Sequence, residues 1–473
     1  MSHPLRVRFA PSPTGSLHLG AIRSALFDYL IAKHTGGTFV LRIEDTDRVR
    51  LVEGAAEVIS QSLDWLDINP DEGVMADGSQ KGDYGPYVQS ERLDIYRQYA
   101  DELVAKKALY PCWCTPERLD DLRKDAQKTG VAFKYDRHCI DDPKTLDQPH
   151  VLRFMIPEKP EVVGWDDVVK GRVEFKTADL DDFVALKSDG FPTYHFAVVV
   201  DDHLMKISHV LRGDEWIPST PKHILLYLAF DWEPTIFVHL PQVLGSDKSK
   251  LSKRHGAKPA LDYRNEGYLP EAVINFLAAL GWNDGSTQEI YTPDELIKAF
   301  TLERIQKSPA VFDAERLTWI DGLYIRELTP ETLLERSKDF WPDEAADYSS
   351  KYVLGVLELV QERLKFMEEI AELTGFFFVD PKADLSLVKG YNEDECQLHL
   401  NTLVEVLGKI RWEHSTLEST LRSYVEENGL KTGQLFGLIR VAITGRTAAP
   451  GLFETMVVLG QKTTLRRLTL ASK

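Results

Sequence analysis

The chain has 473 residues and a formal net charge of −18, with hydrophobic residues at 43% and charged residues at 27%. These values are typical of a soluble globular protein of about three domains. The negative charge excludes non-specific binding of nucleic acid over the whole surface, because the average electrostatic field repels phosphate. No apolar run approaches the roughly 18 residues of a spanning helix, and the N-terminal residues lack the apolar core of a signal sequence. We therefore expect a cytoplasmic protein with no membrane association, in which local basic patches bind any RNA partner.

A strand, a tight turn and a helix are predicted within RVRFAPSPTGSLHLG, residues 6–20. Residues 6–9 alternate charged and apolar side chains, and two prolines and a glycine then end the strand. Apolar residues recur at helical spacing from Leu19, so we expect a helix to begin around His18. The N–H groups and positive dipole end of such a helix suit a phosphate. A proline-rich loop with an incidental histidine explains this stretch equally well.

Further elements are predicted on both sides of an insertion. GTFVLRIEDTDR at 37–48 supplies a second strand that ends in acidic residues, where a parallel sheet presents its functional edge. From about 85 to 190 the pattern changes to mixed helices and short strands, including the strand-like HVLRFMI at 150–156. The alternation of strands and helices resumes with the apolar runs YHFAVVVDDHL at 194–204 and TIFVHLPQVLG at 235–245. A doubly wound parallel sheet split by an inserted domain accounts for this order.

The last third of the chain is predicted to be helical. From about residue 260 nearly every segment has helical periodicity, as in the apolar series between Val353 and Met367. GFFFVD at 375–380 is a strand-like exception. The predicted fold class is therefore α/β with an all-α C-terminal region.

A second motif, GSDKSKLSKRHGA at 245–257, crowds three lysines and an arginine into a Gly- and Ser-rich loop after an apolar strand. Taken alone, such a charge run is most often a solvated face. Combined with the turn at 6–20, it offers a helix N-terminus, a histidine and a lysine loop that follow two strands of one split sheet. This combination is what a polyphosphate requires.

These two stretches resemble a known family. PSPTGSLHLG and KLSKR are similar to the two signature motifs of class I aminoacyl-tRNA synthetases, in the form carried by bacterial-type glutamyl-tRNA synthetases. LRIEDTDR, GPYVQSERLDIYRQYA, TPKHILLYLAFDWEP and KSPAVFDAERLTWIDGLYI resemble further blocks in the family's order, and these blocks extend nearly to residue 330. LIRVAITGRTAAPGLFETMVVLG resembles the anticodon-binding end of the family.

The resemblance implies a split Rossmann-like doubly wound sheet, an inserted α+β domain that binds the tRNA acceptor end, and an all-α anticodon-binding region. The expected boundaries are 1–85 and 191–245 for the two halves of the catalytic domain, 86–190 for the insertion, 246–330 for the KLSKR loop with a stem-contact helical domain, and 331–473 for the anticodon-binding domain.

In this family, activation joins the carboxylate of glutamate to the α-phosphate of ATP and releases pyrophosphate, with Mg²⁺ as cofactor. Because the nucleophile is already charged, catalysis consists of positioning and charge stabilisation. By resemblance, His18, Lys250 and Lys253 are catalytic. Ala21 stands where the family's HIGH tetrad has its second histidine, which leaves more of the task to these three residues. The implied ATP-binding residues are Pro11, Thr14, Gly15, His18, Gly20, Lys250, Ser252 and Lys253.

The resemblance also implies a pocket for the amino acid. Arg8 and Arg212 match arginines that bind the side-chain carboxylate, which a guanidinium group can grip bidentately. Glu44 matches the partner of the ammonium group, and Ser12 and Tyr194 match supporting hydrogen-bonding positions.

Three cysteines indicate a candidate metal site. Cys112, Cys114 and Cys139 resemble the zinc site that some family members carry in the insertion. Zinc takes four tetrahedral ligands, and Asp141 is preferred as the fourth because carboxylate is a commoner zinc ligand than phenolate. Three reduced cysteines without a metal are the alternative. Other nearby candidates for the fourth ligand are Tyr135 and His138.

The resemblance thus implies a monomer that charges tRNA(Glu) with L-glutamate, while charging of tRNA(Gln) stays open. A non-catalytic tRNA-binding paralogue and a glutamyl-Q tRNA(Asp) synthetase are the alternatives, but the latter family lacks the C-terminal domain. Glutaminyl-tRNA synthetases are disfavoured because their C-terminal third forms β-barrels. Candidate basic surfaces for RNA are the 248–258 loop and the side chains of Lys462, Arg466 and Arg467.

Overall fold

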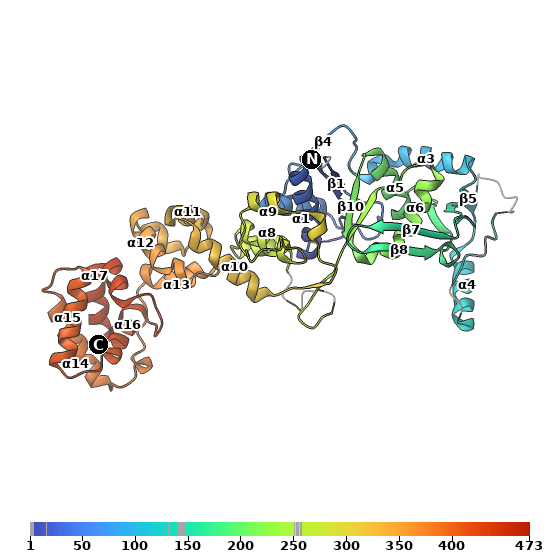
Figure 1. Ribbon diagram of the computed structural model, residues 1–473. Helices are drawn as coiled ribbons and strands as arrows, with labels where there is room; N and C mark the ends of the chain where they lie inside the picture. The colour runs from blue at the N-terminus through green and yellow to red at the C-terminus, as the bar shows by residue number, and fades with distance from the viewer. Residues whose placement is uncertain are drawn as a thin grey trace. The chain divides into compact units, whose positions relative to one another are not determined.

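The computed structural model describes residues 4–15, 17–130, 133–140, 148–249, 251, 255 and 258–473 (Figure 1). These residues form two compact units. The first comprises Met1–Arg264 and Pro270–Ala314, and the second comprises Asn265–Leu269 and Glu315–Lys473.

Short parallel strands form the centre of the first unit. β1 (Arg6–Phe9), β2 (Thr38–Leu41) and β3 (Glu72–Val74) pair in parallel, and β4 (Gln80–Lys81) is antiparallel to β3. β10 (His209–Gly213) pairs in parallel with β11 (Ile236–Leu240). The amide of Ser208 donates to the carbonyl of Arg6 at 2.8 Å, which brings β10 beside β1. The predicted α/β fold class and the strands expected within 6–9, 37–48 and 235–245 are confirmed.

Helix α1 (Leu19–Thr35) begins directly after His18, as predicted. Its apolar residues, including Leu19, Ile22 and Leu26, are buried, and the helix packs on β1 and β2. Helices α8 (Pro270–Ala279) and α9 (Pro293–Ala299) pack against it from the other side (Figure 1). This packing fixes the N-terminus of α1 just beyond the carboxyl end of β1.

The apolar run at 194–204 is a helix, α5 (Tyr194–Leu204), and not the strand that its place in the alternation suggested. Every residue from Phe196 to Asp202 is buried, so the run has no polar face from which its period could be recognised. The length of 11 residues was the available signal, because strands seldom exceed about eight residues. Helix α6 (Thr220–Ala229) packs against α5.

The strand-like stretch GFFFVD is not a strand, and its first four residues are helical. Its phenylalanines, Phe376 to Phe378, form the last turn of α13 (Glu369–Phe378) and are buried in the core of the second unit. Burial on several sides of a helix explains the continuous aromatic run, so the prediction of a strand here is wrong.

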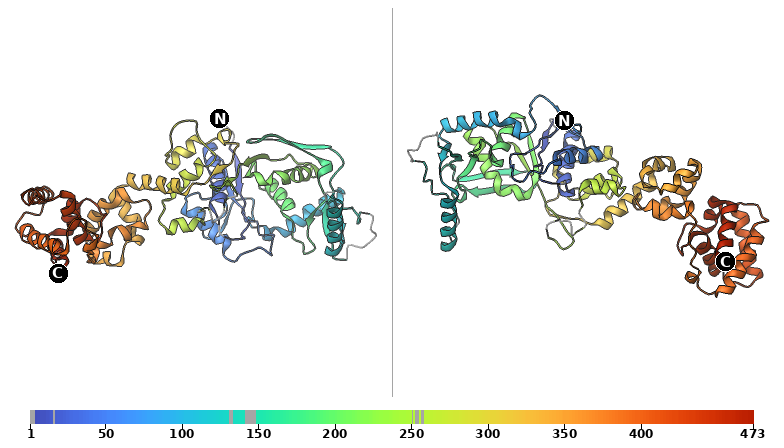
Figure 2. Two further views of the ribbon diagram at one scale, coloured as in Figure 1. Left: turned by 90° about the horizontal axis from the view of Figure 1, so that it is seen from below. Right: turned by 180° about the vertical axis from the view of Figure 1, so that it is seen from behind.

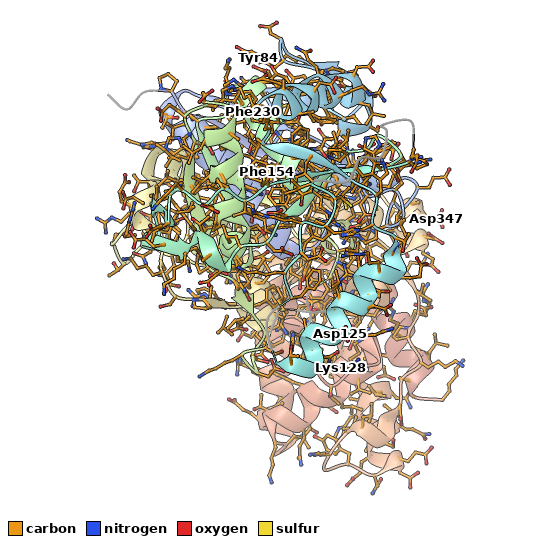
Figure 3. All side chains as sticks on the ribbon, turned by 90° about the vertical axis from the view of Figure 1, so that its right-hand side faces the viewer. Tyr84, Asp125, Lys128, Phe154, Phe230 and Asp347 are labelled. Atoms are coloured by element: carbon orange, nitrogen blue, oxygen red, sulfur yellow. The ribbon has the colours of Figure 1, made fainter. Side chains whose placement is uncertain are left out.

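The predicted insertion contains an antiparallel sheet of β5 (Leu109–Cys112), β6 (Val151–Phe154) and β9 (Phe183–Leu186). The strand expected within 150–156 is thus confirmed. A hairpin of β7 (Val162–Asp167) and β8 (Gly171–Lys176) lies beside β11, where the amide of Val168 donates to Phe237 O at 3.1 Å. The helices in this part of the chain are α3 (Leu93–Ala105) and α4 (Pro116–Thr129), and Figure 3 shows α4 projecting with Asp125 and Lys128 on its outer turns.

The remaining α-helices and β-strands among the described residues of the first unit are α2 (Ala55–Trp65), α7 (Ala260–Asn265) and the parallel pair β12 (Val243–Leu244) and β13 (Ala310–Val311). The second unit is helical, as Figure 2 shows from two sides. Its other helices are α10 (Ala314–Glu327), α11 (Pro330–Arg336), α12 (Ser350–Val360), α14 (Glu393–Leu407), α15 (His414–Glu427), α16 (Thr432–Thr444) and α17 (Leu452–Ala471). Among the residues that the structure describes, no helix has the length and apolar character needed to cross a membrane.

Candidate active site

A pocket of about 930 Å³ lies at the carboxyl ends of β1, β2, β10 and β11. This edge is where parallel α/β sheets bind their ligands. The structure brings most of the predicted amino-acid and phosphate residues to its wall. The predicted residues that line the pocket are Arg8, Ser12, His18, Gly20, Glu44, Tyr194 and Arg212.

The turn between β1 and α1 forms one side of the pocket. His18 is exposed at the first turn of α1, where its carbonyl accepts hydrogen bonds from the amides of Ala21 and Ile22. A Cβ atom at position 20 would lie 3.4 Å from Nδ1 of His18, so Gly20 leaves room for the imidazole ring. Pro11, Thr14 and Gly15 lie in the same turn. This turn is joined to the segment that follows β2, because Glu44 N donates to Pro11 O at 3.0 Å.

The two sequence motifs meet at this turn. His18 forms an isolated antiparallel bridge with Pro259, and the amide of Ala260 donates to Leu17 O at 3.0 Å. Leu251, within the lysine motif, and Lys258, directly after it, line the pocket. The predicted residues Lys250, Ser252 and Lys253 lie outside the described residues.

Arg212 is 6% exposed, at the end of β10. Its guanidinium donates to the hydroxyl groups of Thr220, at 2.7 Å, and Tyr194, at 3.3 Å. It also donates to ring nitrogens of His239 and His223, each at 3.1 Å. All four acceptors are neutral groups, and burial lowers the pKa of Arg212. Among the described residues, none places a carboxylate within ion-pairing distance of this buried cation.

Arg8 has a different environment. Its Nε donates to Asp202 at 3.1 Å, and both side chains are buried. Burial opposes the charge of Arg8, yet the Asp202 carboxylate leaves its pKa above the ordinary value. The same carboxylate accepts from Arg42 at 2.8 Å, and Arg42 also donates to Glu44 at 2.9 Å. Burial raises the pKa of Glu44 even though two arginines favour its ionised form.

Sequence analysis did not identify the partners of these arginines. Asp201 and Asp202 follow the apolar run of α5, and both are buried. Asp201 accepts from Arg92 at 2.7 Å, and also from Gln89 and Tyr96. The available signal was the pair of acidic residues inside an otherwise apolar stretch, because buried carboxylates need cationic or hydrogen-bonding partners. The buried charges cancel when the three cations and three anions are counted together: Arg8, Arg42, Arg92, Glu44, Asp201 and Asp202.

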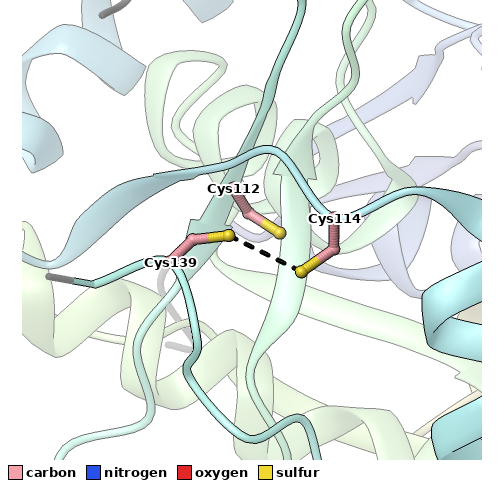
Figure 4. Close-up of side chains that lie close together, drawn as sticks. All are labelled: Cys112, Cys114 and Cys139. Atoms are coloured by element: carbon pink, nitrogen blue, oxygen red, sulfur yellow. Dashed lines mark hydrogen bonds between the residues drawn. The ribbon is translucent and has the colours of Figure 1, made fainter. Parts of the chain in front are cut away.

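The three predicted cysteines converge in the insertion, as Figure 4 shows. Sγ atoms of Cys112, Cys114 and Cys139 all lie within 4.8 Å of one another, which fits a single metal ion. The Tyr135 hydroxyl lies 3.2 Å from the sulfurs of both Cys112 and Cys114. Burial raises the pKa of Cys114 to about 11. The predicted fourth ligand, Asp141, lies outside the described residues.

The candidate RNA contacts at the C-terminus separate into two kinds. Lys462 and Arg466 are exposed on α17. Arg467 is 3% exposed, and it donates to Asp380 and to the carbonyl groups of Ile443 and Val379. The prediction that Arg467 belongs to a basic surface is therefore wrong, because its charge is used within the fold.

Comparison with known proteins agrees with this geometry. Residues 4–319 match the model of the tRNA synthetases class I (E and Q) catalytic domain, and residues 332–472 match an anticodon binding domain. The chain belongs to the class I tRNA synthetases. The sequence-based resemblance is thus confirmed, and the chain is an enzyme of the ligase class that forms aminoacyl-tRNA.

Several class I tRNA synthetases match over their full length. The chain is 45% identical to the glutamate–tRNA ligase of Dehalococcoides mccartyi, over 100% of this chain and 98% of the relative. It is 42% identical to the glutamate–tRNA ligase of Clostridioides difficile, over 98% of both chains. The crystal structure of a glutamate tRNA ligase from Elizabethkingia meningosepticum in complex with its amino acid matches with a TM-score of 0.89 at 35% identity, over 99% of both chains.

Proposed function

We propose that the chain is a glutamate–tRNA ligase that forms glutamyl-adenylate from L-glutamate and ATP and transfers glutamate to the 3′ end of tRNA(Glu). The observation that carries the proposal is the setting of Arg212. A buried guanidinium with only neutral partners among the described residues needs an anion. Because the six buried charges of the cluster around Arg8 and Arg42 cancel among themselves, an amino acid with an anionic side chain supplies the missing charge beside Arg212.

Different residues of the pocket bind different groups of the amino-acid substrate. Arg212 binds the side-chain carboxylate, Glu44 accepts the ammonium group, and Tyr194 and Ser12 add hydrogen bonds. Arg8, whose charge Asp202 already offsets, has the smaller share in carboxylate binding and orients the acidic cluster around the ammonium site.

ATP lies along the turn between β1 and α1 in this proposal. His18 and the N-terminus of α1 hold its phosphates, with Pro11, Thr14, Gly15 and Gly20 allowing the close approach. Lys250, Ser252 and Lys253 complete the site, and the two lysines offset charge on the departing pyrophosphate. Mg²⁺, when bound to ATP, supplies further neutralisation of the phosphate charge.

We also propose one structural zinc ion in the insertion. Three cysteine sulfurs within 4.8 Å of one another are a donor set that zinc favours, and the Tyr135 hydroxyl lies beside two of them. Asp141 stays the predicted fourth ligand, and Tyr135 is the alternative. We expect about one zinc per chain by elemental analysis of protein purified without added metal, and much less in Cys112→Ser. Equal, near-zero zinc in both proteins would favour free thiols.

tRNA(Glu) is the proposed macromolecular partner. The insertion at 86–190 receives the acceptor end, and the helical region from 331 receives the anticodon. We propose a monomer that acts in the cytoplasm, where its tRNA and ATP substrates are found. A glutamyl-Q tRNA(Asp) synthetase is disfavoured because residues 332–472 match an anticodon binding domain. A non-catalytic paralogue is disfavoured because both amino-acid arginines and both motifs are present.

The deciding experiment is aminoacylation with tRNA(Glu) and tRNA(Gln) transcripts, with glutamate and glutamine offered separately. We expect ATP-dependent attachment of glutamate to tRNA(Glu), and none of glutamine. Attachment to tRNA(Gln) as well would identify a ligase that charges both tRNAs. Failure to charge either tRNA with glutamate would overturn the proposal.

A further inference from the structure

The atoms that hold Arg212 come from elements far apart in the sequence. His239 lies on β11, His223 and Thr220 lie on α6, and Tyr194 begins α5. His223 and His239 are buried, at 2% and 0% exposed. The residues around the side chain of Arg212 are therefore held in place by packing. Because they bind its guanidinium, they also fix the orientation of that group.

One hydrogen-bonded chain runs from Arg212 to the insertion. Nε of Arg212 donates to Nε2 of His239, so the proton of that imidazole must lie on Nδ1. Nδ1 then donates to Asp167 Oδ2 at 2.5 Å. Asp167 is itself held, since its Oδ1 accepts from the amides of Val169 and Lys170 at 3.1 and 3.0 Å. An imidazole whose far side is fixed by a carboxylate keeps one tautomer and one orientation.

A second chain leaves the other side of the guanidinium. Nη1 of Arg212 donates to Nδ1 of His223, which leaves the proton of that ring on Nε2 for Nδ1 of His195, at 3.1 Å. Burial lowers the pKa of His223 well below its usual value and lowers that of His195 to about 3. Burial also lowers the pKa of His239. All three rings are therefore neutral at pH 7, and each accepts or relays a hydrogen bond without adding charge.

We propose that His239 and His223, oriented by Asp167 and His195, are positioning residues for recognition of the substrate's side-chain carboxylate. They hold the Arg212 guanidinium with neutral acceptors, so its orientation is fixed while its positive charge is left for the substrate. This inference rests on the proposed function. A carboxylate in place of either imidazole would fix Arg212 equally well but would offset the charge, as Asp202 does for Arg8.

The test compares His239→Leu, which removes the acceptor, with His239→Gln, whose amide oxygen can still accept from Arg212. A third variant, Asp167→Asn, keeps the shape of the carboxyl group but lets an amide N–H face His239 and reverse its tautomer. His209→Gln is the matched control, because His209 is a half-buried histidine on β10, the strand that carries Arg212, and its ring contacts Ser208 and not Arg212. Each protein is assayed as the full chain for aminoacylation of tRNA(Glu), and its thermal unfolding is recorded.

We expect His239→Leu and Asp167→Asn to raise the KM for glutamate by about tenfold or more, because a small misplacement of a binding group has a large effect. The KM for ATP and kcat at saturating glutamate should change by less than about threefold. His239→Gln should recover most of the affinity, and His209→Gln should match the wild type. A merely structural role would instead lower kcat and the affinities for both substrates together.

The outcomes separate this inference from the proposed function. Wild-type protein that fails to charge tRNA(Glu) would overturn the proposed function and the inference with it. Active wild type combined with an unchanged glutamate KM in Asp167→Asn would overturn the inference alone. If His239→Leu does not fold, the comparison of Asp167→Asn with His239→Gln decides, and equal glutamate KM values in these two variants and in the wild type would again overturn it.

Discussion

Arg212 in the first unit and Arg467 in the second are both buried arginines whose pKa burial lowers, but their partners differ. Arg467 donates to the Asp380 carboxylate at 3.0 Å and to two backbone carbonyl groups. The acceptors of Arg212 are two imidazoles and two hydroxyl groups. Burial alone therefore does not identify a binding arginine. The absence of an anionic partner among the described residues is the feature that points to a ligand.

This difference has an energetic basis. A buried cation without a counter-ion costs free energy that the rest of the fold must supply, and a ligand that brings the counter-ion recovers it on binding. A buried cation that is already paired with a carboxylate of the fold, as Arg467 is with Asp380, has no such surplus. The comparison therefore predicts that substitution of Arg212 affects binding, while substitution of Arg467 affects folding.

The largest effect is expected for Arg212→Gln. Its kcat/KM for glutamate should fall by about a hundredfold or more, because a site built to bind a charged group loses its charged partner. Thermal stability should stay close to that of the wild type, since the substitution also removes an uncompensated buried charge. Arg6→Gln is the control, because Arg6 lies on β1 and pairs with Glu72. Wild-type glutamate kinetics in Arg212→Gln would remove this arginine from the pocket.

Arg467→Gln should act on the second unit instead. Loss of its bonds to Asp380, Ile443 and Val379 should lower the free energy of unfolding by about 2 kcal/mol, measured by denaturant titration. Glutamate KM should not change. Arg466 also pairs with Asp380, but from an exposed position. Arg466→Gln should therefore lower the free energy of unfolding by less than about 0.5 kcal/mol. Unaltered stability with weaker tRNA binding in Arg467→Gln would restore the RNA role that its burial excludes.

A smaller effect is expected on RNA binding. Lys462 and Arg466 remain exposed on α17, and we predict that the double variant Lys462→Ala, Arg466→Ala weakens tRNA(Glu) binding and flattens its dependence on salt. Each lost phosphate contact should reduce the logarithmic salt slope by about 0.7 to 0.9. Binding is titrated across a salt series with Arg467→Gln as the comparison. Superimposable slopes would show that this face of α17 is not an RNA surface.

Much of the pocket was predictable because its determinants are local. The strand at 6–9, the turn after it and the helix that starts at Leu19 each follow from proline, glycine and apolar spacing within a few residues. The resemblance then supplied residues such as Arg8 and Arg212, which the structure brings to one pocket.

The partners of these residues were not predictable, because they depend on long-range packing. Asp202 meets Arg8 across 194 positions of the chain, and Asp167 reaches His239 across 72. Nothing in the local sequence distinguishes Arg467 from Arg466, since the turn of α17 alone decides which side chain faces the core. The same limit explains α5, in which burial of every residue from Phe196 to Asp202 removed the periodicity that would have identified a helix.

The smallest effect is expected for Asp28, a buried acid that can be compared with the buried cation Arg212. Asp28 lies on α1 at 1% exposure, and neither of its carboxyl oxygens has a hydrogen-bond partner in the described part of the chain. Burial raises the pKa of Asp28 well above the usual value, because the protonated, neutral acid avoids the cost of a buried charge. A buried arginine cannot become neutral in this way, because its guanidinium group does not lose its proton in proteins.

The sign of its contribution follows from that shift. Because the folded-state pKa exceeds the unfolded one, the stability contributed by Asp28 is full below about pH 4 and falls as the pH rises toward the folded-state value. Asp28→Asn removes this dependence on pH. The two proteins should therefore have similar Tm values near pH 4, and the Tm of the variant should be about 2 °C higher than that of the wild type at pH 7. Asp94→Asn is the control, because Asp94 is an exposed acid on α3, and its substitution should not raise Tm at pH 7. A variant less stable than the wild type at pH 7 would mean that Asp28 is ionised and is stabilised by the charge of Arg8, which Asp202 already pairs.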